Sequence, residues 1–297
     1  MNWREAPGVL RAHRKCILDT LVFFAVLAAA AMHAGWNAMV KLGIDHYSSI
    51  ALLTFMQAGI SLVLIPFFPL PAQAAWPWLA ASAIIHAGYK LFLIRAYEHG
   101  ELSQIYPLAR GSAPVLTALV SVLYIGDAFP AQKLVAIGCI AGGVLLMSLR
   151  GGSDLRRMPP QALIWALGTA CFTAAYTIVD GIGARLSGTP SAYTFWMFAG
   201  DGFFILLWTF HRRGRTAFAA MQPVLMTGFI AGALSLVAYW VVIWAFTQAP
   251  IALVAALRET SVLFAMLFGI FLLKERATWP RWVAAALIVA GVILIRL

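Results

Sequence analysis

Arg110 and Arg258 each lie inside an apolar run long enough to cross a membrane, at matching positions in two copies of one unit. A shift of 148 positions (258 − 110) places residues 110–149 on residues 258–297 without a gap and gives nine identities in forty positions. In a chain of this apolar composition, chance alone would give roughly four identities. A charge inside a membrane segment is costly and usually marks a substrate or ion pathway. The duplicated arginines therefore indicate transport.

Further polar side chains lie on the same helical face as Arg110. Tyr106, Arg110 and Thr117 follow a helical spacing. Pro107 and Pro114 lie on either side of Arg110, and each frees a backbone carbonyl, so a kinked helix is expected. A helix with free carbonyls can line a polar cavity. We therefore expect this stripe to form one wall of a substrate site.

Two other runs contribute candidate contacts. His86 and Lys90 lie one helical turn apart, as do His33 and Asn37, with Trp36 beside them. The competing interpretation of the histidines is a neutral ring hydrogen-bonded between helices. The full set of candidate substrate contacts is His33, Trp36, Asn37, His86, Lys90, Tyr106, Arg110, Thr117, Trp240, Arg258 and Glu259.

Two acids are candidates for ion pairing or for ion coupling. Asp201, in the middle of an apolar run, is the most expensive acid to bury, and Glu259 directly follows Arg258. Asp201 is expected to pair with Lys90, Arg110 or Arg258, and these alternatives stay open. Because prolines flank Arg110, we interpret it as the substrate contact and Arg258 as half of an internal pair. A purely structural role for both arginines is the alternative.

Composition places the chain among integral membrane proteins. Apolar residues make up 62% and charged residues 11%, and the mean hydropathy is +0.87. Cys16, Cys139 and Cys171 lack metal-ligand spacing, so neither a disulfide framework nor a metal centre is indicated. The net charge of +10 resides in the amino-terminal tail and the short breaks, where it would meet lipid headgroups. No nucleic-acid partner and no cofactor are expected.

Ten apolar runs fill the chain, and the breaks between them are too short for a soluble domain. A basic tail, residues 1–17, precedes the first repeat, 18–149; a linker, 150–160, separates it from the second, 161–297. Because each repeat has five runs, an odd number, the second begins on the opposite side of the membrane. The expected fold is all-α, with ten transmembrane helices in a five-plus-five inverted repeat. The predicted helices are 18–40, 48–68, 76–97, 102–124, 132–149, 161–183, 191–210, 223–247, 251–273 and 281–297.

Small residues recur at one helix position in both copies. Gly138 and Gly142 map onto Ala286 and Ala290. Four-residue spacing of small side chains lets membrane helices approach closely. We interpret this pattern as close helix packing and not as a binding site.

The start of the chain permits two interpretations. Arg11, Arg14 and Lys15 before an apolar stretch would also suit a signal peptide, but its removal would break the five-plus-five symmetry. We therefore expect a first helix at 18–40. With the amino terminus in the cytoplasm, seven Lys and Arg fall on that side and ten on the other. This count opposes the orientation that the basic tail favours, so the orientation stays open.

Four segments resemble the EamA branch of the drug/metabolite transporter superfamily. They are residues 96–114, 33–37, 126–127 and 274–276. The resemblance covers almost the whole chain and implies a ten-helix inverted-repeat carrier with a central cavity and both termini in the cytoplasm. Characterised relatives export amino acids or other small metabolites. Small multidrug carriers of the superfamily rely on a glutamate in the first helix, whereas the first helix here has only Asp19 at its edge.

Together these features predict an exporter of small polar metabolites, such as amino acids or organic anions, that works by alternating access in the cell membrane, the bacterial inner membrane. Its partners would be a small-molecule substrate and the lipid bilayer, with proton coupling and a homodimer left open. The alternatives are a flippase for a lipid-linked head group and a membrane-embedded enzyme. The sequence contains neither His-Glu-x-x-His nor Gly-x-Ser-x-Gly, so we expect no enzyme.

Overall fold

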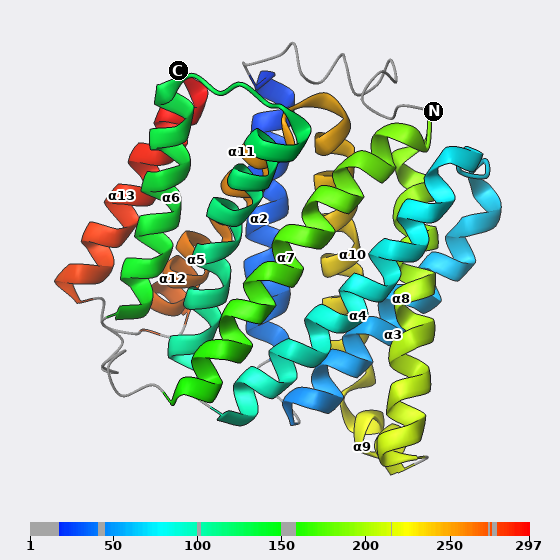
Figure 1. The fold of residues 1–297 in the computed structure, drawn as a ribbon. Helices are drawn as coiled ribbons and strands as arrows, with labels where there is room; N and C mark the ends of the chain where they lie inside the picture. The colour runs from blue at the N-terminus through cyan, green and yellow to red at the C-terminus, as the bar shows by residue number, and fades with distance from the viewer. Residues whose placement is uncertain are drawn as a thin grey trace.

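The computed structural model describes residues 18–40, 45–99, 102–149, 159–214, 216–272, 274 and 278–297, and over these residues it contains helices and no strands. The helices form one bundle (Figure 1). Those of the first repeat are α2 (Thr20–Val40), α3 (His46–Leu64), α4 (Trp76–His99), α5 (Leu102–Val120) and α6 (Ala131–Leu149). Those of the second are α7 (Pro160–Leu186), α8 (Pro190–Arg213), α9 (Thr216–Met221), α10 (Leu225–Gln248), α11 (Ile251–Arg258), α12 (Ser261–Leu272) and α13 (Trp279–Arg296). Short 3₁₀ turns lie at Ile65–Phe67, Gln73–Ala75 and Gln222–Val224, and a π-helical turn at Ser121–Ile125 follows α5.

The predicted helix positions agree with the observed ones to within three residues when these short turns are included. One prediction is wrong. The run 251–273 is two helices, because the chain leaves the α-helical path at Glu259 and Thr260. By contrast, α5 is continuous from Leu102 to Val120 although it contains two prolines. The irregular backbone therefore lies beside Arg258 and not beside Arg110.

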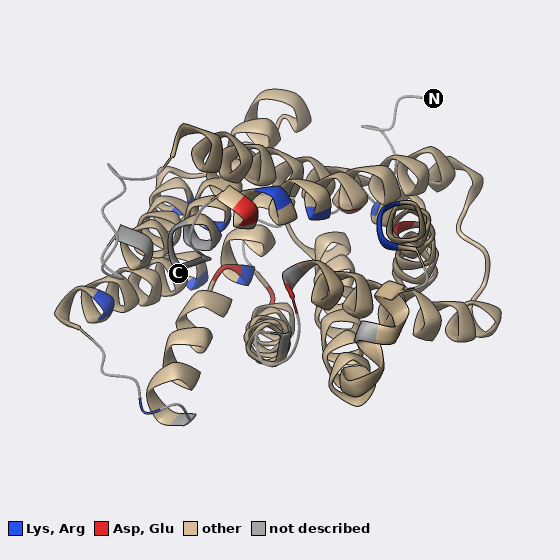
Figure 2. Ribbon diagram, turned by 90° about the horizontal axis from the view of Figure 1, so that it is seen from below, with Lys and Arg blue, Asp and Glu red and all other residues tan. Residues whose placement is uncertain are grey.

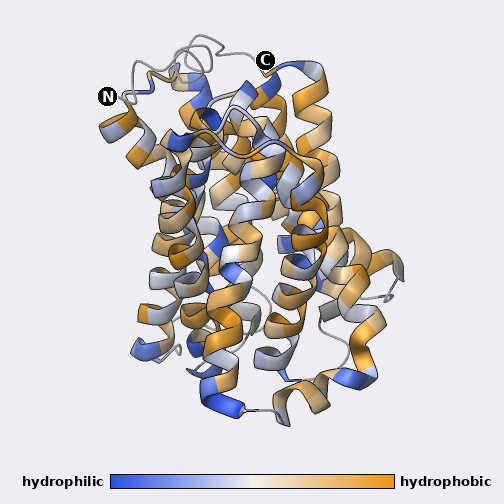
Figure 3. Ribbon diagram, turned by 90° about the vertical axis from the view of Figure 1, so that its right-hand side faces the viewer, coloured by the Kyte–Doolittle hydropathy of each residue, from blue (hydrophilic) through white to orange (hydrophobic). Residues whose placement is uncertain are grey.

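Eight segments of the described chain are long and apolar enough to cross a membrane, and Ala131–Met147 is a shorter apolar helix. The predicted count of ten is not confirmed by this criterion. α8 is not among the eight segments. It has 24 residues, but it carries Asp201 and ends in His211, Arg212 and Arg213. These polar side chains lower its mean hydropathy. Figure 3 shows hydrophilic positions mainly at the two ends of the bundle and apolar ones between them.

Both ends of the described chain lie at the same end of the bundle (Figure 1). Arg296, at the end of α13, donates hydrogen bonds to the Leu18 carbonyl at 2.8 Å and to Thr20 Oγ1 at 2.6 Å, at the start of α2. We call this the terminal end. Because the start of α2 and the end of α13 lie at the same end of the bundle, the helices between them would cross a membrane an even number of times.

The two repeats pack against each other through equivalent helices. α6 packs along α13, and the two contacts mirror each other. A Cβ on Gly143 would lie 2.6 Å from Ile288 Cγ1, and one on Gly291 would lie 2.6 Å from Ile140 Cγ1. The 148-residue shift therefore relates both glycines and both isoleucines in space. The prediction that Gly138 takes part in close helix packing is wrong, because nothing lies within 4 Å of a Cβ placed there.

The largest apolar core gathers at the terminal end. It contains the start of α2, the ends of α7 and α10, the start of α8 and all of α11 except Ala255 and Arg258. Every residue of α11 is buried, because α2, α5, α6, α7, α10 and α13 surround it. Only smaller apolar clusters occur elsewhere among the described residues. The bundle is therefore most tightly packed at the terminal end.

Large apolar side chains cover the outside of the bundle. Phe24, Val63 and Ile84 are each more than half exposed, as are Phe203 and Ile293. Such exposure over several helices is unfavourable in water and favourable in lipid. The outer surface therefore matches a bilayer environment.

Candidate functional site

Glu259 is a fully buried acid that contacts two buried arginines. Its Oε2 lies 2.8 Å from Arg110 Nε, and its Oε1 lies 3.6 Å from Arg258 Nη2. Arg110 Nη2 also donates to Ser261 Oγ at 3.1 Å. Two guanidiniums therefore face one buried carboxylate. We call Arg110, Arg258 and Glu259 the arginine centre.

The arginine centre is incompletely hydrogen-bonded. Among the described residues, neither carboxylate oxygen of Glu259 nor Nε of Arg258 has a hydrogen-bond partner. The contact of Glu259 with Arg110 is close enough for an ion pair, but the N–H is not aligned on the carboxylate. A buried polar atom without a partner costs about 1–3 kcal/mol. The arginine centre therefore has the capacity to bind a further polar group.

The break between α11 and α12 positions the arginine centre. Arg258 is the last residue of α11. The Glu259 N–H then donates to the Ala256 carbonyl at 3.0 Å, and the Thr260 N–H donates to that of Leu257 at 3.1 Å. These i→i−3 bonds tighten the chain and end the α-helix. Discontinuous helices buried within the membrane are typical of substrate and ion sites in carriers.

α2 brings His33 and Trp36 towards the arginine centre. The guanidiniums of Arg110 and Arg258 are both close enough to act electrostatically on His33. The His33 and Trp36 rings meet edge to face with centroids 4.8 Å apart. The indole N–H of Trp36 has no hydrogen-bond partner among the described residues. Asn37 instead turns back along its own helix, donating to the His33 carbonyl at 2.8 Å.

A second buried acid, Asp180 on α7, is fully hydrogen-bonded. Its Oδ2 accepts from Tyr239 Oη at 2.5 Å and lies 3.0 Å from His86 Nε2. Its Oδ1 accepts from Tyr193 Oη at 3.1 Å and from the Ser82 hydroxyl. These partners come from α4, α8 and α10. We call Asp180 and its four partners the aspartate centre.

A third buried charge pair joins the two repeats. Lys90 on α4 donates from Nζ to Asp201 Oδ2 on α8, and both side chains are nearly inaccessible to solvent. The other oxygen, Oδ1, has no hydrogen-bond partner among the described residues. Of the three partners that the sequence allowed for Asp201, the structure selects Lys90. The pair neutralises both charges where burial is most costly.

Tyrosine rings connect the aspartate centre to the arginine centre. The guanidinium carbon of Arg258 lies 5.8 Å from the Tyr176 ring centroid and 6.0 Å from that of Tyr239. His86 stacks on Tyr176 at 4.2 Å. Figure 2 shows charged positions on helices within the bundle as well as at its rim. The tyrosine rings therefore join the arginine centre to the aspartate centre.

Comparison with known proteins places the chain in a family. The sequence profile of the EamA-like transporter family matches residues 20–149 and again residues 160–297. The chain belongs to the EamA-like transporter family. Solved structures also match it, 29 chains in all. One, a crystal structure of another protein, superposes with a TM-score of 0.68 at 14% identity and covers 93% of this chain and 95% of that chain. At this identity the likeness concerns the fold alone. No curated protein matches the chain.

Several predicted contacts of this EamA-family protein lie together, and others do not. Arg110, Arg258 and Glu259 meet in the arginine centre. The side chain of Tyr106 lies outside the described residues. The Thr117 hydroxyl donates to the carbonyl of residue 113 in its own helix at 2.9 Å. It contributes no bond between helices.

Trp240 lies in an aromatic cluster near the terminal end. Its indole N–H donates to Ser191 Oγ at 3.0 Å. Its ring meets Phe195 at 5.0 Å and Phe68 at 6.1 Å between centroids. The contacts of Trp240 are therefore apart from those of both centres.

Arg258 forms an ion pair with Glu259, as expected, but it shares that acid with Arg110. Glu259 contacts both arginines, and its distance to Arg110 is the shorter one. The reason is the helix break, which turns the Glu259 side chain towards α5. Adjacent residues on an unbroken helix would point about 100° apart.

Sequence reasoning missed Asp180 and the tyrosines around it. The predicted helix ended at residue 183, which placed Asp180 near a membrane surface, whereas α7 continues to Leu186. A detectable signal was an acid between the apolar pairs 178–179 and 181–182. Tyr176 and Tyr239 carried no signal of their own because tyrosine is common at membrane interfaces.

Two buried cations that were not candidates support the fold. Arg185 donates to the carbonyls of Phe246 and Ala249 at 2.8 and 2.9 Å, at the end of α10. Lys133 donates to the Ile295 carbonyl at 2.9 Å, near the end of α13. Cations at helix carboxyl ends satisfy free carbonyls and stabilise the helix dipole. Both lie at the terminal end and hold it together.

Proposed function

We propose that this EamA-family protein is a secondary transporter of small carboxylate-bearing metabolites, amino acids or organic anions, and that the arginine centre binds the carboxylate. The observation that carries the proposal is the convergence of two buried guanidiniums on one carboxylate, where Arg258 Nε lacks a hydrogen-bond partner among the described residues. Guanidiniums bind carboxylates through paired, charge-assisted hydrogen bonds. A substrate carboxylate would accept a hydrogen bond from Arg258 Nε.

The rest of the network favours a zwitterion within this class. Tyr176 and Tyr239 present ring faces between the two centres, and aromatic faces attract ammonium groups. The aspartate centre beyond them carries negative charge. A free amino acid would therefore direct its carboxylate to the arginines and its ammonium group towards the tyrosines. His33 and Trp36 would contact the remainder of the substrate.

Transport by alternating access requires that one end of the path be closed. The tightly packed terminal end, with α11 at its centre, supports the proposal that this structure is sealed on that side. Because α11 ends at Arg258, a shift of α11 would couple opening of the seal to the state of the arginine centre. We include α6 and α8 among the crossing helices, which gives ten crossings in a five-plus-five inverted repeat in the bacterial inner membrane.

The aspartate centre is our candidate for proton coupling. Asp180 Oδ2 lies 3.0 Å from His86 Nε2, a hydrogen-bond distance along which a proton can pass, and the other partners of Asp180 are the hydroxyl groups of Ser82, Tyr193 and Tyr239. If protons drive transport, flux should follow an imposed pH gradient, and His86→Gln should abolish that dependence. A flux that ignores the gradient in the wild-type protein would exclude coupling.

The experiment for the proposed function is counterflow in proteoliposomes. Labelled amino acids and small organic anions are tested one at a time with the wild-type protein, Arg258→Gln and Lys274→Gln. Lys274 is exposed. Lys274→Gln removes one positive charge, as Arg258→Gln does, but outside the arginine centre, so it serves as the matched control. At least one carboxylate should accumulate with wild type and control and not with Arg258→Gln. Accumulation of none, or equal accumulation with Arg258→Gln, would refute the proposal.

A further inference from the structure

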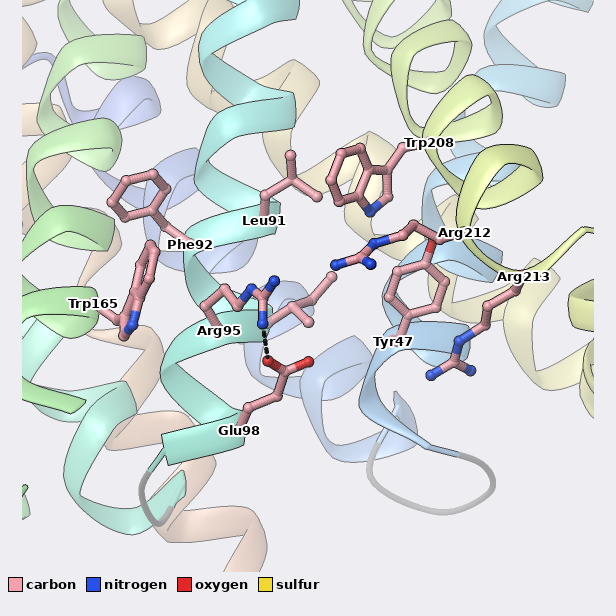
Figure 4. A pocket seen from close by; sticks show the side chains of 10 residues that line it. Tyr47, Leu91, Phe92, Arg95, Glu98, Trp165, Trp208, Arg212 and Arg213 are labelled. Carbon is pink, nitrogen blue, oxygen red and sulfur yellow. Dashed lines mark hydrogen bonds and ion pairs between the residues drawn. The ribbon is translucent and has the colours of Figure 1, made fainter. Parts of the chain in front are cut away.

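A pocket of about 390 Å³ opens between α4 and α8 at the end of the bundle opposite the terminal end (Figure 4). Arg95 on α4 and Arg212 on α8 line it, with Trp208 and Tyr47 beside Arg212 and Trp165 beside Arg95. In Figure 4 the two guanidiniums extend from their helices into the same space. Convergence of like charges at one place is stable when an anion lies between them.

The charges around this pocket do not balance. Arg95 pairs with Glu98 at 3.0 Å, and Arg213 pairs with Asp45 at 3.0 Å. Within the described part of the chain, Arg212 has no ion pair or hydrogen bond; its guanidinium carbon lies 5.4 Å from the Trp208 ring centroid. The positive charge of Arg212 is therefore uncompensated. An anionic ligand would supply the missing partner.

The surface next to the pocket indicates where that anion comes from. Ile84 and Leu91 are two helical turns apart on the face of α4 that carries Arg95, and Phe204 lies two turns from Arg212 on α8. Ile84 is 58% and Phe204 38% exposed on the lipid-facing surface. These apolar rows lead from the pocket towards the middle of the membrane. A free phosphate would leave them without a partner, whereas acyl chains would cover them.

We propose that the pocket between α4 and α8 binds the phosphate of an anionic phospholipid from the adjacent leaflet. Arg95 and Arg212 bind the phosphate oxygens, and Trp165 and Trp208 lie at the depth of the headgroup, where tryptophan is favoured. Basic pockets between transmembrane helices are suited to such headgroups. The site is separate from the arginine centre and does not depend on the proposed transport function.

The test is a thermal-shift titration of the delipidated full-length protein with phosphatidylglycerol, phosphatidylcholine or inorganic phosphate. Phosphatidylglycerol should raise the Tm of the wild-type protein by about 5 °C more than phosphatidylcholine does, and inorganic phosphate should not reproduce the shift. Arg212→Gln should lose at least half of that difference, and the matched control Lys274→Gln should keep it. Because Arg212 has no ion pair or hydrogen bond to lose among the described residues, its substitution should leave the fold intact.

Three results would overturn the proposal: an equal phosphatidylglycerol shift in Arg212→Gln, an equal shift with phosphatidylcholine, or an equal shift with inorganic phosphate. Native mass spectrometry of the wild-type protein gives a reading that needs no variant. Phosphatidylglycerol should stay bound at collision energies that remove phosphatidylcholine. Loss of both lipids at the same energy would also refute the site.

Discussion

Asp180 and Glu259 are both fully buried acids, yet their surroundings differ in kind. Asp180 has hydrogen-bond partners on three other helices, and they satisfy both of its oxygens. Glu259 faces two guanidiniums and has no aligned hydrogen bond. A satisfied acid holds helices together, whereas an unsatisfied one between two guanidiniums can exchange partners. The comparison assigns stability mainly to the aspartate centre and substrate binding mainly to the arginine centre.

Removing the aspartate should have the largest effect. Asp180→Ala leaves four polar groups on three helices without their shared acceptor, so we expect a loss of about 3–5 kcal/mol in stability. Folded yield and the Tm in detergent measure it. A variant that folds like the wild-type protein would show that the aspartate centre does not hold the bundle together.

Arg110→Ala should lower transport strongly while leaving more folded protein than Asp180→Ala. Loss of one charge-assisted contact to the substrate is worth about 3 kcal/mol, which corresponds to roughly a hundredfold lower transport rate at limiting substrate. Counterflow measures the rate, and gel filtration measures the folded fraction. If yield collapses and the remaining protein transports normally, Arg110 is a structural residue and the comparison fails.

Tyr239→Phe should sharpen the comparison with a smaller change. It removes the 2.5 Å hydrogen bond to Asp180 and keeps the ring face near Arg258. We expect about 1.5 kcal/mol lower stability and little change in substrate affinity. Chemical denaturation and a binding titration separate the two quantities. A large loss of affinity at unchanged stability would instead place the hydroxyl in contact with substrate.

Asp45, outside the membrane segments, should show the smallest effect. Partial burial tends to raise the pKa of its carboxyl, but hydrogen bonds from Ser48 and the charge of Arg213 outweigh burial and lower the pKa below its usual value. Its stabilising contribution is therefore present above the unfolded-state pKa of about 3.9 and is lost as the pH falls through the lower folded-state pKa. At this largely exposed pair the contribution is below about 1 kcal/mol. Acid denaturation followed between about pH 5 and about pH 3, the range around the ordinary Asp pKa, measures the effect. Asp45→Asn should lose slightly less stability over this range than the wild-type protein. An identical acid profile for the two proteins would contradict this account.

The helices were predictable because each apolar run has the length that a bilayer demands. The mirrored packing of Gly143 and Gly291 follows the 148-residue repeat, but the spacing of small residues had pointed to Gly138 and Gly142 instead. The break at Glu259 was not predictable, because neither proline nor glycine marks it. Its cause is local 3₁₀ bonding within a fully buried segment.

The sequence identified several buried charged residues individually, but it did not show which of them pair with each other. Lys90, Arg110 and Arg258 were all plausible partners of Asp201, and only the packing of α4 against α8 decides in favour of Lys90. Asp180 was overlooked because the predicted helix ended three residues too early. Partner choice depends on tertiary contacts, which residue types and spacing within one helix do not contain.

The most direct test of the central claim is ligand binding to the arginine centre, measured by thermal shift over a panel of amino acids, organic anions and lipophilic cations. At least one carboxylate ligand should raise the Tm of the wild-type protein and of Lys274→Gln, and the shift should vanish in Arg258→Gln. Stabilisation by lipophilic cations alone, or a carboxylate shift that persists undiminished in Arg258→Gln, would contradict the account.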